Sequence, residues 1–146
     1  MLWYLNNKKS DPSLPDPAGQ FAWLESTLLR ARESNTKVLL ICHFPPGATE
    51  NSPSKYRHFF DNYNERFLNL LRRNADILIG GLFAHQHTDT FRVLKKQDEP
   101  VLPLLFGPSI SPWRLGGLGA FNPRVRVFEY SRSTLRLMDY HQLFLN

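Results

Sequence analysis

Two histidines separated by one residue, His85 and His87, have a type and a spacing that could do chemistry. A neutral imidazole is the commonest protein ligand of zinc and similar ions. The pair follows a strand-like apolar run at 77–79 and two glycines. On an extended chain a spacing of two puts both imidazoles on the same side, close enough to serve one metal ion or two neighbouring ones. A solvated or hydrogen-bonded pair with no metal role is the alternative reading of this motif.

A third histidine, His43, directly follows the buried-strand pattern Val-Leu-Leu-Ile-Cys at 38–42 and precedes Phe-Pro-Pro-Gly at 44–47. A ligand-capable side chain at the carboxyl end of a buried strand, before a rigid turn, stands where α/β folds place their chemistry. Adjacent parallel strands end side by side, so we expect His43, His85 and His87 to converge.

These segments, His-Phe-Pro-Pro-Gly at 43–47 and Ala-His-Gln-His at 84–87, resemble motifs of the calcineurin-like metallophosphoesterases. The resemblance is closest to the acid sphingomyelinase-like phosphodiesterases, and it extends from about residue 5 to residue 146. It implies a single partial domain over residues 1–146, the C-terminal half of the catalytic domain. The implied fold class is α/β, part of a metallophosphoesterase β-sandwich flanked by helices. The flanking matches are Asp-Pro-Ala-Gly-Gln-Phe-Ala-Trp-Leu at 16–24, Gly-Pro-Ser at 107–109 and Asn-Pro at 122–123.

The resemblance implies metal-assisted hydrolysis of a phosphodiester in a lipid head group or nucleotide. In the family two zinc ions are bound, and by resemblance His43 and His85 would hold one metal and His87 the other. The resemblance implies further ligands from earlier elements: an Asp-x-His pair, a bridging Asp and an Asn-His pair. We expect none of these in the chain, since no histidine precedes His43 and no Gly-Asn-His occurs. We therefore expect an incomplete site with no certain catalytic residue, at most one weakly bound zinc ion, and little or no activity.

Two other functions stay open at this stage. The chain could be a shortened, non-catalytic product that binds or regulates, or a basic surface-binding module whose histidines hold no metal. Two departures from the family pattern also matter. Ala84 replaces a glycine, which would cost roughly 1 kcal/mol if the backbone needs a positive φ. Gln86 replaces the usual threonine and alters the turn.

The long segment 107–123 contains Trp113 and Arg114, which we expect to bind substrate at the rim of the same cleft. An aromatic face and a fixed cation suit a polar head group with a phosphate. A connection without function is the equally weighted alternative.

The composition is that of an ordinary globular protein of 146 residues with a net charge of +5. This charge suits phosphate-bearing partners or an anionic membrane surface, but the basic residues are scattered and form no nucleic-acid motif. The single cysteine, Cys42, excludes an internal disulfide and is expected to be a buried structural thiol. The first residues do not form a signal peptide pattern. The resemblance implies a secreted or lysosomal protein, with a missing N-terminal half as a partner.

Local patterns divide the chain into a connector at 1–15, a helix–strand–helix–strand unit at 16–87 and a mainly β part at 88–146. An N-cap at Asp16 with Pro17 at the first helical position predicts a helix ending near 34–35. An aromatic stripe from Tyr56 to Leu71 predicts a second helix with a buried face. The predicted strands are 37–42, 76–82, 90–94, 101–106, 124–130 and 134–140, the first two of them parallel.

Overall fold

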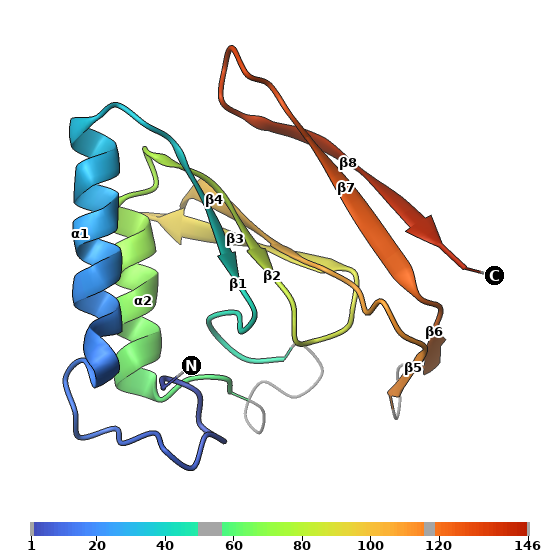
Figure 1. Ribbon diagram of the computed structural model, residues 1–146, viewed down its shortest axis with the longest axis horizontal. Helices are drawn as coiled ribbons and strands as arrows, with labels where there is room; N and C mark the ends of the chain where they lie inside the picture. The colour runs from blue at the N-terminus through green and yellow to red at the C-terminus, as the bar shows by residue number, and fades with distance from the viewer. Residues whose placement is uncertain (1, 50–56, 116–118, 146) are drawn as a thin grey trace.

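The computed structural model describes residues 2–49, 57–115 and 119–145, and it contains two α-helices and eight strands within these ranges. A 3₁₀ turn at Pro17–Gly19 leads into α1, and the elements follow in the order of their labels (Figure 1). The helices are α1 (Gln20–Glu33) and α2 (Asp61–Arg73). The strands are β1 (Val38–Cys42), β2 (Leu78–Phe83), β3 (Thr90–Lys96), β4 (Glu99–Phe106), β5 (Trp113–Leu115), β6 (Gly119–Phe121), β7 (Arg124–Tyr130) and β8 (Leu137–Phe144).

A four-stranded mixed sheet with the order β1-β2-β4-β3 organises the molecule. β1 and β4 both run parallel to β2, and β3 is antiparallel to β4. Both helices lie on one face of this sheet, and the β7–β8 hairpin lies on the other side (Figure 1). At one point the hairpin reaches the sheet, because a Cβ added at Gly80 would lie 3.9 Å from Leu137 Cδ2. The expected α/β class and the parallel pairing of the first two strands are confirmed.

The first helix begins three residues later than the sequence predicts. Ala18 and Gly19 adopt positive φ angles of 57° and 63°, which a right-handed helix cannot include. The Asp16 carboxylate nevertheless acts as the cap, because it accepts hydrogen bonds from the Phe21 and Ala22 amides at 2.8 and 2.9 Å. The predicted cap is therefore present, with one extra turn between it and α1.

The second helix begins at Asp61, so the prediction that it already includes Phe59 and Phe60 is wrong. Phe59 instead forms an antiparallel bridge with Tyr4, which requires an extended backbone. Tyr56, where the predicted stripe begins, lies outside the described residues. Inside α2 the predicted apolar face is confirmed, since Tyr63, Phe67, Leu70 and Leu71 are all buried.

Two strands are displaced from their predicted bounds because of turns. β2 starts at Leu78, after a turn in which the Ile77 and Leu78 amides both donate to the Asn74 carbonyl. β8 starts at Leu137, because the Ser131 amide bonds the Arg136 carbonyl and Leu135 has a positive φ of 54°. By contrast, β7 has the predicted bounds.

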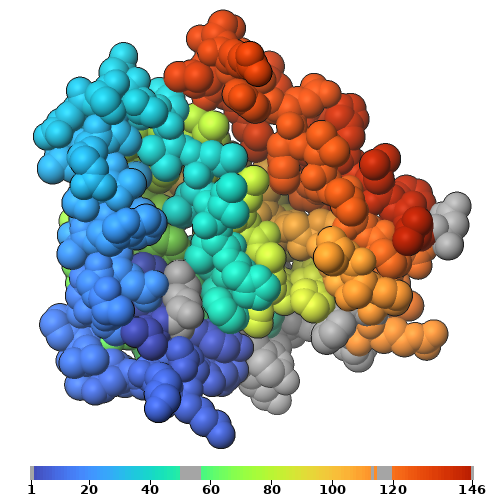
Figure 2. All heavy atoms as spheres, in the orientation of Figure 1, coloured from blue at the N-terminus to red at the C-terminus, as the bar shows by residue number. Residues whose placement is uncertain are grey.

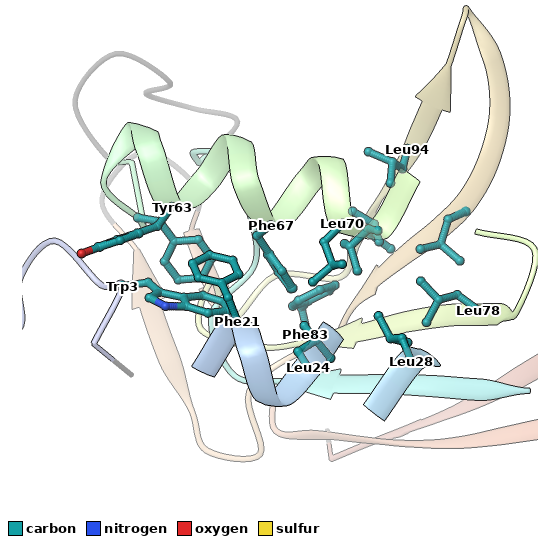
Figure 3. Close-up of a cluster of buried hydrophobic side chains, with 14 of the residues drawn as sticks. Trp3, Phe21, Leu24, Leu28, Tyr63, Phe67, Leu70, Leu78, Phe83 and Leu94 are labelled. Atoms are coloured by element: carbon teal, nitrogen blue, oxygen red, sulfur yellow. The ribbon is translucent and has the colours of Figure 1, made fainter. Parts of the chain in front are cut away.

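The core lies between the two helices and the sheet, and it is rich in aromatic rings (Figure 3). Trp3 is 2% exposed and stacks on Phe21 with ring centroids 4.0 Å apart. It also meets Phe59 and Phe67 at 5.9 and 5.4 Å. Residues 1–15, expected to be a connector, therefore supply a central core residue.

The other face of the sheet is open. Ile41, Phe91 and Val93 are 73%, 66% and 46% exposed. A hollow of about 510 Å³ separates the sheet from the hairpin turn at 134–137. Figure 2 shows β2 at the floor of this gap, between β1 and the hairpin. Among the described residues, no helix has the length and apolar character to cross a membrane.

Candidate metal centre

His43 immediately follows β1, as the sequence predicts, and its side chain is exposed. The turn after it is held in place by buried Pro45 and Pro46 and by Gly47, whose φ is 88°. The Gly47 amide donates to Asn64 Oδ1 of α2 at 2.7 Å, and the Gly47 carbonyl accepts from the amide of His58 at 3.2 Å. The loop that presents His43 is thus tied to the start of the second helix.

His85 and His87 lie in the loop after β2, and the expectation that they occupy extended chain is wrong. β2 ends at Phe83, and the two histidines have left-handed φ angles of 71° and 59°. Each such angle in a residue with a Cβ costs about 1–2 kcal/mol, and strain of this kind gathers at functional sites. Ala84 has no positive φ, so replacing the family's glycine there carries no such cost.

The two loops are joined directly. The Ala84 amide donates to the His43 carbonyl at 3.0 Å, and the rings of His43 and His85 have centroids 5.3 Å apart. His87 lies near enough to act on His85 electrostatically. The structure therefore brings His43 and His85 into contact, and it places His87 near His85.

Three aromatic neighbours hold the His85 ring. Phe44 lies 4.4 Å from it between centroids, Tyr4 lies 5.6 Å away edge to face, and His58 lies 5.1 Å away. His58 is 3% exposed, and its Nε2 is 3.2 Å from the Gln86 side-chain nitrogen. His58 belongs to no motif in the sequence. Its position beside aromatic residues was the one local signal that it would be buried.

The 5.3 Å separation of the His43 and His85 ring centroids matches the spacing of two imidazoles that share a zinc ion. Two imidazoles that bind one tetrahedral zinc at about 2.0 Å have ring centroids about 5 Å apart. Burial, followed by the nearby charges of His43 and His87, lowers the pKa of His85, which favours its neutral, ligand-competent form. Over residues 2–49, 57–115 and 119–145, no group of three or more His, Cys, Asp or Glu side chains is placed to hold a metal ion. The case for a zinc site in the described residues therefore depends on His43 and His85 alone.

Arg92 of β3 holds the turn that follows His43. Its guanidinium donates to the carbonyls of Pro46, at 2.5 Å, and Ala48. It also lies 4.7 Å over the ring of Phe106. A planar fork that bridges two carbonyls fixes the direction of the chain between them.

The structure shows the backbone position of both predicted substrate-binding residues and the exposure of one of them. Trp113 and Arg114 belong to β5, which pairs with β6 inside the segment expected to be an irregular loop. This small hairpin lies beyond the end of β4, at the same end of the sheet as the loops after β1 and β2 (Figure 1). Arg114 is exposed, and the side chain of Trp113 lies outside the described part of the chain.

Cys42 is partly buried, and burial raises the pKa of its thiol, as suits a structural cysteine. An Asp-x-His triplet does occur at 139–141, after the histidine motifs in chain order. His141 is exposed there, with its Nε2 2.6 Å from Glu129 Oε1 on the neighbouring strand.

Parallel strands ending in histidine-bearing loops, with helices on one face and further strands on the other, fit part of a metallophosphoesterase fold. No protein-family model matches the chain. The chain is 37% identical, over 99% of its length, to acid sphingomyelinase-like phosphodiesterase 3b of Homo sapiens. It is 33% identical, over 99% of its length, to sphingomyelinase phosphodiesterase C of Dictyostelium discoideum. It is also 33% identical, over 90% of its length, to a cyclic GMP-AMP phosphodiesterase of Homo sapiens.

The chain is therefore a relative of the acid sphingomyelinase-like phosphodiesterases along nearly its whole length, which confirms the resemblance seen in the sequence. It spans about a third of the length of these curated relatives, 32%, 34% and 29% of the three respectively.

Proposed function

We propose that the chain forms the histidine-bearing part of a zinc-dependent phosphodiesterase site. His43 and His85 would hold one zinc ion, and His87 would face a second. The observation that supports this most directly is the 5.3 Å separation of the His43 and His85 rings, at the ends of two neighbouring parallel strands. The names of the relatives, all phosphodiesterases, support the reaction class.

A bound zinc ion would polarise a phosphoryl oxygen and lower the pKa of a bound water. The chain's own residues prepare the donors. Burial lowers the pKa of His85, which favours the neutral imidazole, and the rings of Phe44 and Tyr4 pack against it. Arg114, with Trp113, is proposed to meet the polar head group of the substrate at the same end of the sheet.

The substrate class we propose is a phosphodiester in a lipid head group or a nucleotide. One relative is named a sphingomyelinase phosphodiesterase, which points to a lipid head group, and another is named a cyclic GMP-AMP phosphodiesterase, which points to a nucleotide. The net charge of +5 favours an anionic substrate and would also favour contact with an anionic membrane surface. A secreted or lysosomal location is part of the same proposal.

The site in this chain is proposed to be incomplete, with zinc bound weakly and little or no turnover. Neutral imidazoles supply no charge to balance divalent ions, and no carboxylate joins His43 and His85 in a metal-holding group among the described residues. We further propose that another polypeptide segment completes it. The open sheet face with exposed Ile41, Phe91 and Val93 would suit such a segment, because apolar surface of this kind marks an interaction site.

The second candidate is a non-catalytic product that binds or regulates. The lack of a carboxylate beside His43 and His85 among the described residues favours this candidate. A site without its charged ligands can bind a phosphate ester without hydrolysing it. Turnover in the presence of a completing segment separates the two candidates.

Zinc titration of the purified 146-residue chain by calorimetry tests the metal site. His43→Ala and His85→Ala should each abolish saturable binding. His141→Ala should not, because His141 lies on the exposed hairpin beside Glu129. Zinc binding that survives both of the first two substitutions would refute the proposed ligands.

Hydrolysis of bis(p-nitrophenyl) phosphate with zinc tests the reaction. We expect no appreciable turnover by the chain alone, and metal-dependent turnover when the preceding catalytic segment of a full-length relative is added. Turnover by the chain alone that His85→Ala abolishes would show that the site is complete. Zinc binding without turnover in the mixture would favour the non-catalytic candidate.

A further inference from the structure

Arg126 of β7 is buried in a hairpin that leaves its valines outside. Its side chain is 4% exposed, while the adjacent Val125 and Val127 are 55% and 52% exposed. An arginine is rarely placed inside when its apolar neighbours are not, unless its charge is paired. The hairpin therefore turns its polar face toward the rest of the protein.

The partner of this buried charge is Asp89. Arg126 Nη2 lies 2.6 Å from Asp89 Oδ1, and Gln142 Nε2 of β8 donates to Asp89 Oδ2 at 2.8 Å. The guanidinium also donates to Gln142 Oε1 at 2.8 Å and to the Phe106 carbonyl at 3.2 Å, and it lies 4.1 Å over the ring of Tyr140. Each strand of the hairpin thus binds one oxygen of the Asp89 carboxylate.

Asp89 is the last residue of the loop that contains the candidate ligands. It stands two residues after His87 and directly before β3, whose first residue, Thr90, pairs with Phe106. Arg126 donates hydrogen bonds to Asp89 and to the Phe106 carbonyl, so one side chain connects the end of this loop to the end of β4. At its other end the loop is held by the bond from Ala84 to His43.

We propose that Arg126 is a positioning residue, which holds the His85–His87 loop in its left-handed conformation through Asp89 and makes the β7–β8 hairpin part of the metal centre. Two positive φ angles in non-glycine residues persist only where the surroundings over-determine them. The zinc readout rests on the proposed function, whereas the conformational readout does not.

A purely structural role is the alternative. The Arg126 side chain is 4% exposed and the Asp89 side chain 32%. Desolvation of the arginine offsets much of the attraction in such a pair, so its net contribution to stability is small and its clearest effect can be on geometry. If Arg126 were only structural, replacing it would lower the stability of the fold but leave the loop conformation of the folded molecules unchanged. A positioning residue would change the loop itself.

The experiment compares Arg126→Met with Arg132→Met, an exposed arginine in the turn of the same hairpin. Tyr63→Phe, which removes a hydroxyl of α2 bonded to the Asp11 and Leu14 carbonyls, serves as a destabilised comparator away from the loop. The histidine signals of metal-free ¹⁵N-labelled protein are recorded by NMR, zinc affinity by calorimetry and stability by urea unfolding. Asp89→Asn removes the carboxylate charge that pairs with Arg126. It is a second test variant, and it carries the test alone if Arg126→Met does not fold.

We expect Arg126→Met and Asp89→Asn to shift or broaden the His85 and His87 signals and to weaken zinc binding about tenfold, as loss of an outer-shell partner does. Arg132→Met and Tyr63→Phe should leave both readouts as in the wild type. Unchanged histidine signals in both test variants, or equal changes in Tyr63→Phe, would overturn the proposal. If the wild type binds no zinc, the proposed metal site fails, and the NMR comparison still decides the positioning role.

Discussion

Replacing Arg92 by methionine should loosen the turn that presents His43. Methionine keeps the apolar contact with Phe106 and removes the donors to the Pro46 and Ala48 carbonyls. A hydrogen bond from a charged group contributes about 1.5–3 kcal/mol, and the cation–π contact adds about 1 kcal/mol at a partly exposed site. These contributions are not additive, so we expect a loss of about 3 kcal/mol in the free energy of unfolding.

A loss of that size is large compared with the total stability of about 5–15 kcal/mol that is usual for a domain. For a chain of this length it corresponds to a fall in Tm of about 6–12 °C. Thermal and urea unfolding followed by circular dichroism measure it. Arg92→Lys should recover less than half of the loss, because an ammonium cannot bridge two carbonyls as a planar fork does. Arg132→Met, in the exposed hairpin turn, should change stability by less than about 0.5 kcal/mol. If Arg92→Met were no more damaging than that control, or Arg92→Lys were fully stable, the bridging role would be refuted.

Three further substitutions test other parts of the fold. Gly47→Ala should cost about 2 kcal/mol in urea unfolding, because φ is 88° and a Cβ would lie 2.9 Å from an Arg92 nitrogen. Gly107→Ala, where the nearest atom is an ordinary 3.5 Å away, is its control, and equal losses would contradict this reasoning. Tyr63→Phe should cost about 1 kcal/mol through the lost hydroxyl bond, and no change in the urea midpoint would exclude it. Arg32 lowers the pKa of Asp76, so this exposed pair should add a small, salt-screened stabilisation above about pH 4, and the effect should fade as pH drops below that. Asp76→Asn should flatten the acid limb of a stability–pH curve, and an unchanged limb would refute the contribution of the pair.

The bounds of β7 could be predicted because its pattern is local. Five alternating residues from Arg124 to Phe128, set between Asn-Pro and a serine-rich turn, leave little choice of strand or length. Which face is buried could not be predicted in the same way. The valines form the more apolar face of the strand. Arg126 nevertheless points inward, because Asp89 in the loop before β3 pairs with its charge.

The beginning of α2 shows the same limit. Phe59 and Phe60 continue the helical stripe, so their spacing alone favours helix. The backbone bridge between Phe59 and Tyr4 keeps this segment extended, and a residue so distant along the chain leaves no mark on the local pattern. The burial of Trp3, in the segment at 1–15, is unpredictable for a related reason: Trp3 becomes part of the core only because α1 and α2 close around it.

The sequence by itself determined the types of the candidate ligands and their places at two strand ends. An apolar run that stops at a histidine is a local signal, and parallel neighbours must end at one edge. Only the tertiary structure decided how these histidines are held. The left-handed angles at His85 and His87, and the buried His58 beside them, result from hydrogen bonds and ring contacts between segments distant in sequence. Such contacts depend on the chain path as a whole, because the energy that offsets local backbone strain is supplied by neighbours that the local sequence does not contain.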